Sequence, residues 1–300
     1  MATRIVITDA YSSLGQAILR GFEHTQFSIL IPKSHVVDWC DEHQVQEYLD
    51  AHSPQLIINT VGWSEYPTES QREQLVQAAG NIARMGRRYA CDVIHLSSFR
   101  VFGGENKSSY DEADRPSPLG PAGRSYWEAE RIFEQHLQRY LCIRVGWLLD
   151  VHSDTLLSRL LSGLLAESPC AVTDQRMGTP IGLQPLVKVV VSITNQILCG
   201  AENWGVVHYA CGDACSVEEL AEALVDHLRD DHNMSRDLWF VEVEDEEHPL
   251  LAKEPVSAAL TMRRCRDDFG VQHKSWRQGL GNTVSQYLEL HNSYPVPAAD

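Results

Sequence analysis

Short apolar runs alternate with helix-like segments through the first half of the chain. The runs are rich in Val and Ile, and the segments between them place apolar residues at helical spacing. Strands are expected at 4–8, 27–31, 55–62, 92–98 and 141–149, and helices at 12–23, 41–52, 72–90 and 125–140. Strands joined in this way form one parallel sheet with helices on both faces. The sequence therefore predicts an α/β fold, a Rossmann-type doubly wound parallel sheet.

The pattern becomes less regular after Asp150. Ser216 and Glu219 have the spacing of a capping box at the start of a helix. Helices are expected at 154–167, 183–200, 216–228 and 275–290, a strand at 205–212, and loops at 171–182 and 245–255. We therefore predict a dinucleotide-binding domain (1–150, joined again by 183–212), a smaller C-terminal α/β substrate-binding domain (151–182 and 213–292) and a frayed tail (293–300).

The composition is that of an ordinary globular protein, with 43% hydrophobic and 22% charged residues. The formal net charge of −16 argues against nucleic acid or an anionic membrane as a partner, because both attract cationic surfaces. No apolar run approaches the ~20 residues that span a bilayer. The N-terminus enters a strand without a signal-peptide pattern, so a cytoplasmic location is expected.

The eight cysteines and thirteen histidines show no pattern of a metal site. Cys211 and Cys215 are the only close cysteine pair, and their spacing is neither a CxxC redox motif nor half of a common zinc site. The histidines have neither HxH nor HExxH spacing. We expect reduced cysteines and no bound metal.

A series of segments carries a resemblance to a known family. In order, they read QLIINTVGW, VIHLSSFRVFGG, YDEADRPSPLGPAGRSYWEAE, IRVGWLL, DQRMGTP, VVHYACG and EPVSAALTMRRCRDDFGV. Together they are similar to the dTDP-4-dehydrorhamnose reductase family of extended short-chain dehydrogenases, in register over nearly the whole chain. The resemblance implies a dinucleotide-binding domain and a smaller domain that binds a nucleotide-sugar. The family also contains non-reducing, regulatory relatives.

The family's glycine-rich turn, approximately T-G-A-x-G-x-L-G, reads TDAYSSLG here. Asp9 and Ser12 replace two glycines that let the backbone approach a pyrophosphate. Asp9 either places a carboxylate near that anion, where like charges ~4 Å apart repel by about 1 kcal/mol in water, or caps the following helix. Weak binding of a dinucleotide is expected in both cases. The residues of this turn that would meet a cofactor are Thr8, Ser12, Ser13, Leu14 and Gly15.

The end of the second strand carries Lys33 instead of the acidic residue that reads a ribose hydroxyl. A cation at this point favours a 2′-phosphate, so NADP(H) is the expected cofactor, weakly bound if it binds at all. The alternative is that Lys33 is a solvated surface lysine.

The family's proton-donating site combines a Ser or Thr after the fourth strand with a Tyr-x-x-x-Lys pair, whose lysine lowers the pKa of the phenol. Ala122 stands at the tyrosine position and Tyr126 at the lysine position, so of this set only the hydroxyl of Ser98 remains. Tyr126 lies one helical turn, about 5.4 Å, from the family's tyrosine, and a displacement of about 1 Å can cost orders of magnitude in rate. The helix is expected to have lost its acid.

The side of the molecule that would hold the sugar is better preserved. Trp147 occupies the place where the family presents a tryptophan to the sugar ring, and stacking there needs no catalysis. Gln175 and Arg176 lie in a loop similar to the family's D-Q-x-G-x-P and could meet hydroxyl or phosphate groups. The alternative is that Trp147 belongs to the core and Arg176 is a surface charge.

Two hypotheses follow. The first is a weakly active or non-catalytic sugar-nucleotide-binding or regulatory protein on the reductase scaffold. The second is an active NADP(H)-dependent nucleotide-sugar reductase with a rebuilt site. The missing Tyr and Lys favour the first. A nucleotide-sugar is the expected ligand, and a protein partner or a homo-oligomer is left open.

Overall fold

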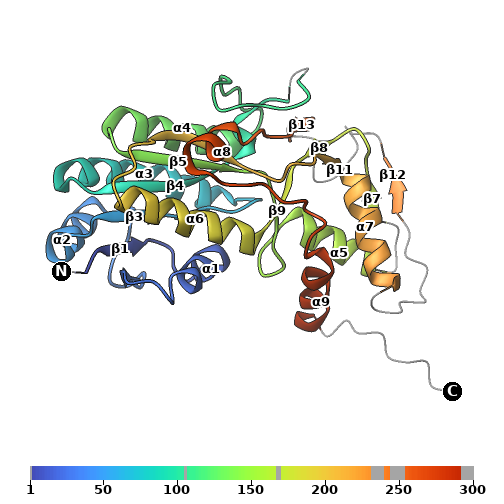
Figure 1. Ribbon diagram of the computed structural model, residues 1–300, viewed down its shortest axis with the longest axis horizontal. Coiled ribbons are helices and arrows are strands. Elements are labelled where there is room, and N and C mark those ends of the chain that lie inside the picture. Colours follow the sequence, from blue (N-terminus) through green and yellow to red (C-terminus); the bar gives the residue numbers. More distant parts are fainter. Residues whose placement is uncertain (1, 105–106, 167–169, 231–239, 244–253, 292–300) are drawn as a thin grey trace.

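The computed structural model describes residues 2–104, 107–166, 170–230, 240–243 and 254–291. Its largest element is a six-stranded parallel sheet in the order β10-β5-β4-β3-β1-β2 (Figure 1). The strands are β1 (Arg4–Ile7), β2 (Ser28–Leu30), β3 (Leu56–Asn59), β4 (Asp92–Ser98), β5 (Tyr140–Val145) and β10 (Gly205–Tyr209). The predicted doubly wound parallel sheet is confirmed. Because β1 lies between β2 and β3, the strand order reverses at β1, which is where such sheets bind ligands.

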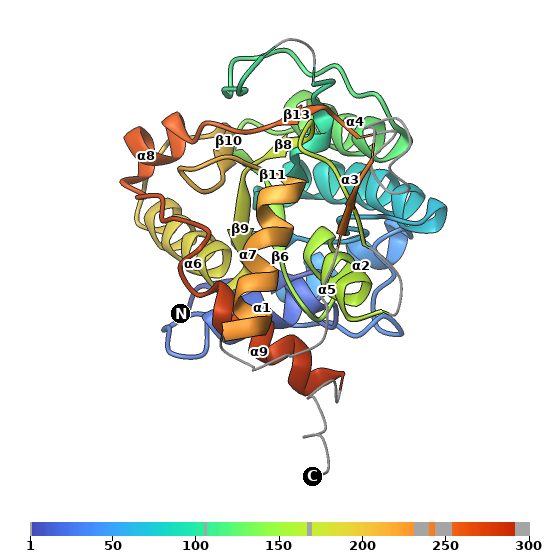
Figure 2. The same ribbon diagram turned by 90° about the vertical axis from the view of Figure 1, so that its right-hand side faces the viewer.

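Apolar side chains of alternate strand residues build two cores, one on each face of the sheet. Val6 belongs to the core on one face, whereas Ile5 and Ile7 belong to the core on the other. The first core contains residues of α2 (Glu42–His52), α3 (Glu69–Tyr89) and α4 (Pro121–His136), and the second contains residues of α1 (Ser13–Gly21) and α6 (Leu183–Leu198) (Figure 2).

Most of the remaining elements form a smaller lobe beyond the carboxyl ends of the strands (right-hand side of Figure 1). Three helices, α5 (Leu156–Leu165), α7 (Val217–Asp230) and α9 (Leu280–Leu290), pack there against one another. The short strands are β6 (Trp147–Leu149) with β9 (Pro180–Gly182), β8 (Met177–Gly178) with β11 (Cys215–Ser216) and β13 (Ser257–Ala258), and β7 (Cys170–Val172) with β12 (Phe240–Glu242).

Several helix boundaries have a local cause. Ser216 and Glu219 form the predicted capping box of α7, each side chain accepting the other residue's backbone N–H. The helix expected from residue 125 begins instead at Pro121, because proline suits the first helical position. The helix expected from residue 275 begins at Leu280, after Gly279 in the left-handed region at φ 88°.

Other differences from the predicted elements arise from long-range pairing. The strand expected at 141–149 is divided at Gly146 into β5 and β6, because β6 leaves the large sheet to pair with β9. The expected loop at 171–182 contains β8 and β9. The predicted strand at 205–212 is β10, and α8 (Arg263–Phe269), which was not predicted, packs against it.

The proposed division into two domains stays a prediction. The tail at 293–300 and most of the expected loop at 245–255 lie outside the described residues. Within the described residues, no helix is long and apolar enough to cross a membrane.

Candidate functional site

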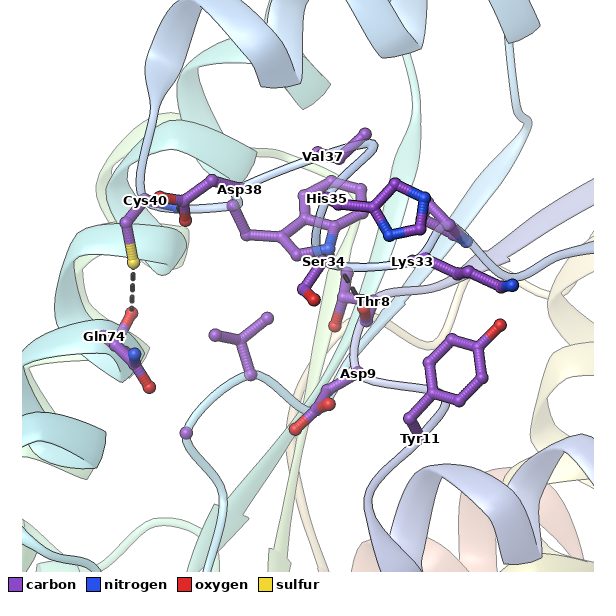
Figure 3. A pocket seen from close by; sticks show the side chains of 14 residues that line it. Thr8, Asp9, Tyr11, Lys33, Ser34, His35, Val37, Asp38, Cys40 and Gln74 are labelled. Carbon is purple, nitrogen blue, oxygen red and sulfur yellow. Dashed lines mark hydrogen bonds between the residues drawn. The ribbon is translucent and has the colours of Figure 1, made fainter.

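A cavity of about 590 Å³ lies at the carboxyl ends of β1, β2 and β3, where the strand order reverses (Figure 3). Its walls come from four segments that are distant in sequence: the turn after β1, the loop after β2, the loop after β3 and helix α3. We call it the nucleotide cleft, because this is the place where doubly wound sheets bind nucleotides. Its lining includes Thr8, Asp9, Tyr11, Lys33, Ser34, His35, Asp38, Trp39, Val61, Gly62 and Gln74.

The turn after β1 holds the start of α1 close to the strand. Ser12 caps α1: its hydroxyl accepts the N–H of Gly15 at 3.1 Å and donates to the carbonyl oxygen of Asp9 at 2.8 Å. The cap is thus Ser12, and the alternative in which Asp9 caps the helix is wrong. A Cβ on Gly15 would lie 1.9 Å from the carbonyl oxygen of Asp9, so this turn requires glycine at position 15.

The Asp9 side chain lines the nucleotide cleft, and Figure 3 shows its carboxyl group projecting into the cavity. Partial burial raises its pKa above the usual value for an aspartate. In its ionised form, a carboxyl group at this position repels a pyrophosphate that comes close to the turn. Even in its protonated form it occupies volume that a glycine would leave open.

The other predicted cofactor residues divide into two groups. Lys33 lines the cleft with Tyr11, and Thr8 lines it at the base. The side chains of Ser13 and Leu14 serve the scaffold, since Ser13 donates to the Asp150 carboxylate at 2.7 Å and Leu14 is buried in the core between sheet and helices. Neither Ser13 nor Leu14 is among the residues that line the cleft.

Sequence reasoning missed the segment that closes the cleft on the side of β2. Trp39 is 6% exposed, and its indole N–H donates to the carbonyl oxygen of Thr8 at 3.0 Å. One carboxylate oxygen of Asp38 accepts the N–H of Cys40 at 2.9 Å. The available signal was the run VVDWCD just before α2, which must pass the ends of β1 and β2 to connect these elements.

The predicted reaction centre lies where β4 meets α4. The Ser98 hydroxyl is buried and accepts the N–H of Arg100 at 3.3 Å, which begins the short helix η1 (Phe99–Val101). Tyr126 is 0% exposed; its phenol donates to the carbonyl oxygen of Ser64 at 2.7 Å and accepts the N–H of Ser64 at 3.1 Å. Burial raises the pKa of this phenol above its usual value. Tyr126 therefore fastens the loop after β3 to α4.

A buried ion pair occupies the space beside Tyr126. Arg100 is 4% exposed, with its Nε 2.6 Å from a carboxylate oxygen of Glu254. The guanidinium carbon of Arg100 lies 5.0 Å from the centre of the Tyr66 ring and 4.5 Å from that of Phe99. Sequence reasoning missed this pair because its two members are far apart in the chain.

Glu65 adds a second carboxyl group to this cluster. Its side chain is buried, and one oxygen accepts the N–H of Leu156 at 3.4 Å. Burial raises the pKa of Glu65 to about 8, against the opposite effect of Arg100, so the group carries a proton near pH 7. Burial thus produces a neutral acid close to the reaction centre.

The three residues predicted to meet the sugar lie in different surroundings. Trp147 is 4% exposed in the core, and a Cβ on Gly178 would lie 2.2 Å from its ring. This position supports the packing alternative. Gln175 is exposed. Arg176 is buried and donates to the main-chain carbonyl of Glu254, so it is not a surface charge. Arg176 and Arg100 thus hold the same residue, one by its carbonyl and the other by its carboxylate.

All eight cysteines are free thiols, and six of them are buried. Among the described residues, no three His, Cys, Asp or Glu side chains come together in a group that could hold a metal ion.

Comparison with known proteins agrees with this architecture. A dTDP-4-dehydrorhamnose reductase of Aggregatibacter actinomycetemcomitans is 22% identical, with 95% of this chain and 99% of the relative covered. A dTDP-4-dehydrorhamnose reductase of Mycolicibacterium smegmatis is 23% identical, with 99% and 90% covered. The crystal structure of the Bacillus anthracis dTDP-4-dehydrorhamnose reductase in complex with NADP is similar with a TM-score of 0.81 at 21% identity, over 95% of this chain and 100% of that one.

The family model described as the RmlD substrate binding domain matches residues 3–289, nearly the whole chain. The chain therefore belongs to the RmlD-like family, that of the dTDP-4-dehydrorhamnose reductases.

Proposed function

We propose that this protein binds a nucleotide or nucleotide-sugar on the reductase scaffold without reducing it, as a sugar-nucleotide-binding or regulatory protein. The observation that supports this most directly is the state of Tyr126. Its phenol is buried, and its proton is donated to the carbonyl oxygen of Ser64. Ala122, at the family's tyrosine position, has no hydroxyl. The family's tyrosine position thus has no proton to donate, and the phenol at its lysine position donates its proton to the backbone.

The ion pair beside Tyr126 also supports the proposal. The Nε atom of Arg100 lies 2.6 Å from a carboxylate oxygen of Glu254, and both side chains have little exposure to water. Removing one partner would leave an uncompensated buried charge. A substrate that reached this point would have to displace Glu254 or supply a carboxylate or phosphate of its own. An anionic substrate at Arg100 would therefore compete with the protein's own carboxylate.

The nucleotide cleft fits one part of a dinucleotide and not another. Lys33, Tyr11 and His35 at its rim suit a ribose or a 2′-phosphate, which agrees with NADP(H) as the expected cofactor. The half-buried carboxyl of Asp9 does not suit the pyrophosphate. We therefore assign no hydride-transfer step to the bound cofactor and expect its binding to be weak.

Titration calorimetry with NADPH tests the cofactor part of the proposal. The protein is expected to bind NADPH weakly, and Asp9→Gly is expected to improve the affinity. Asp9→Asn is the matched control, since it removes the charge but keeps the shape of the side chain. A submicromolar dissociation constant for the unchanged protein would contradict the proposal.

The reduction itself is tested by following NADPH oxidation in the presence of dTDP-4-dehydrorhamnose. Loss of general acid catalysis typically lowers a rate ~10²–10⁴-fold, so the rate is expected to be near background. Turnover at an ordinary enzyme rate, on the order of 1–10³ s⁻¹, would contradict the proposal and favour an active reductase with a rebuilt site.

One observation favours that second candidate function. The Glu65 carboxyl is protonated near pH 7 and lies in the same cluster as Arg100. If turnover is found, Glu65→Gln distinguishes the two readings: a loss of turnover with unchanged stability would assign the acid role to Glu65. In the non-catalytic protein the same variant changes no reaction rate.

Binding of a sugar nucleotide is tested by thermal shift with a panel of such compounds, because a ligand of the folded state must stabilise it. Stabilisation by at least one compound supports the proposal, and none at millimolar concentration would contradict it. Trp147→Ala is expected to lower the free energy of unfolding by about 3–5 kcal/mol, as for other buried tryptophans. A well-folded variant that loses only ligand binding would instead assign a stacking role to Trp147.

A further inference from the structure

The nucleotide cleft ends before it reaches the start of α1. From the turn after β1, the residues Thr8, Asp9 and Tyr11 line the cavity, whereas none of its lining residues belongs to α1. In a doubly wound sheet, the pyrophosphate of a dinucleotide lies at the N-terminus of the first helix. The cavity therefore covers the place of one nucleoside and stops short of the place where the bridge to a second nucleoside would lie.

An anionic group of the chain itself lies beside the first residue of α1. One carboxylate oxygen of Asp150, which follows β6, accepts a hydrogen bond from the Ser13 hydroxyl at 2.7 Å. Asp150 is 3% exposed, and its carboxylate also accepts the Ser153 hydroxyl at 2.5 Å and the His152 N–H at 3.0 Å. These three donors hold the carboxylate in place, so a phosphate at the start of α1 would meet a fixed negative charge.

Asp9 places a second carboxyl group at the end of the cleft that is next to α1. Its carbonyl oxygen accepts the hydroxyl of Ser12, the residue that caps α1, and its carboxyl group projects into the cavity (Figure 3). Repulsion between single charges ~4 Å apart corresponds to about a fivefold loss of affinity in water. Because no hydrogen bond or ion pair holds this carboxyl group within the described residues, a smaller residue at position 9 would lose no polar contact.

The rest of the cleft suits a base and a single phosphate. Figure 3 shows Lys33 and Tyr11 on one side of the cavity and Asp38, Cys40 and Gln74 on the other. Lys33 follows β2, where a cation can pair with a phosphate on the 2′-oxygen of a ribose. The Asp38 carboxylate and the Gln74 amide can form hydrogen bonds with the polar edge of a base.

We propose that the nucleotide cleft is a mononucleotide site, selective for a nucleoside 2′-monophosphate over the same nucleoside with a further phosphate on its 5′-oxygen. The Lys33 ammonium pairs with the 2′-phosphate, whereas a 5′-phosphate meets Asp9 and a longer phosphate chain meets Asp150 as well. This inference rests on the proposed function, because it takes the cleft as a nucleotide site, and it adds the class of nucleotide that the cleft accepts.

The test is a calorimetric titration of the full chain at neutral pH and constant ionic strength. The four ligands are adenosine, adenosine 2′-phosphate, adenosine 2′,5′-bisphosphate and NADPH. Adenosine 2′-phosphate is expected to bind about fivefold tighter than adenosine, and Lys33→Gln is expected to remove this gain. The bisphosphate is expected to bind about fivefold more weakly than the 2′-phosphate, and NADPH no more tightly than the bisphosphate.

Variants of Asp9 test the cause of this order. Asp9→Gly is expected to raise the affinity for the bisphosphate at least to that for the 2′-phosphate, and to leave the latter nearly unchanged. Asp9→Asn removes the charge but keeps the volume, so it is expected to give part of the gain. Asp50→Asn, at an exposed position of α2, is the matched control for loss of one negative charge and should leave the ratio of the two affinities unchanged.

Three results would overturn the inference: tighter binding of the bisphosphate than of the 2′-phosphate by the unchanged protein, a ratio of the two affinities that Asp9→Gly does not change, or no gain of the 2′-phosphate over adenosine. With NADPH binding still weak and NADPH oxidation near background, each of them would leave the proposed function standing. Turnover of dTDP-4-dehydrorhamnose at an enzyme rate would instead contradict the proposed function, whatever the order of these affinities.

Discussion

Replacing Tyr126 by phenylalanine separates a structural role of this side chain from a catalytic one. The substitution removes one oxygen atom and leaves the buried ring in place. That oxygen makes two hydrogen bonds, of 2.7 Å and 3.1 Å, to the backbone of Ser64. Without it, the N–H and carbonyl of Ser64 lose their partner inside the protein. A buried polar group left without a partner costs about 1–3 kcal/mol, and a typical hydrogen bond contributes about 1 kcal/mol net.

We therefore expect Tyr126→Phe to lower the free energy of unfolding by about 2 kcal/mol, measured by urea denaturation with an unchanged dependence on urea concentration. Tyr11→Phe is the control, because Tyr11 is 52% exposed, and its effect should stay within about 0.5 kcal/mol. Any slow oxidation of NADPH should be the same in Tyr126→Phe as in the unchanged protein. A Tyr126→Phe protein that is as stable as the unchanged protein, yet loses a measurable reduction, would refute the structural role.

Two further predictions concern buried charge. Burial lowers the pKa of His95 and of His208 to about 3, so both are neutral in the folded protein and charged only in the unfolded chain below the unfolded pKa of about 6.5. The contribution of these neutral histidines to the stability of the folded protein is complete above that pH and is lost as the pH falls. The raised pKa of Glu65 changes stability with pH in the opposite direction, so the measurement uses the Glu65→Gln variant. The free energy of unfolding of this variant should fall by about 4 kcal/mol between about pH 7.5 and about pH 5. An unchanged free energy of unfolding would contradict the two histidine pKa values. In the wild-type protein, Nη2 of the buried Arg144 lies 2.6 Å from a carboxylate oxygen of Glu130. Glu130→Ala leaves Arg144 without this anionic partner and should lower the free energy of unfolding by about 3–5 kcal/mol in the same assay. A loss below about 1 kcal/mol would contradict this prediction.

The elements that sequence predicts well are those whose cause is local. Val6 and its neighbours Ile5 and Ile7 read as a buried strand because both faces of the sheet are covered, and Ser216 with Glu219 marks a helix start by spacing alone. The short strands β8 and β9 have no such signal. Two or three residues carry no periodicity, and only their pairing with distant partners makes them strands.

The site shows the same distinction. The family resemblance places Tyr126 at the lysine position, but its partner Ser64 lies 62 residues earlier, and no local pattern links the two. The Arg100–Glu254 pair joins the end of β4 to a segment near the C-terminus. Such contacts follow from the completed fold, so the sequence predicts which residue stands at each family position but not the distant residues that it contacts.

The Arg100–Glu254 pair bears on how a ligand could bind. Glu254 is held by two arginines, Arg100 at its carboxylate and Arg176 at its carbonyl, so the segment that carries it is fixed against the end of β4. A buried ion pair is stable only while both partners are present, and an anionic ligand at Arg100 would have to exceed the contribution of a carboxylate that is already in position. Among the described residues that line the nucleotide cleft, a ligand has no ion pair to displace, although the Asp9 carboxyl there opposes its phosphate groups. The Arg100–Glu254 pair therefore favours binding at the nucleotide cleft over binding of an anion at Arg100.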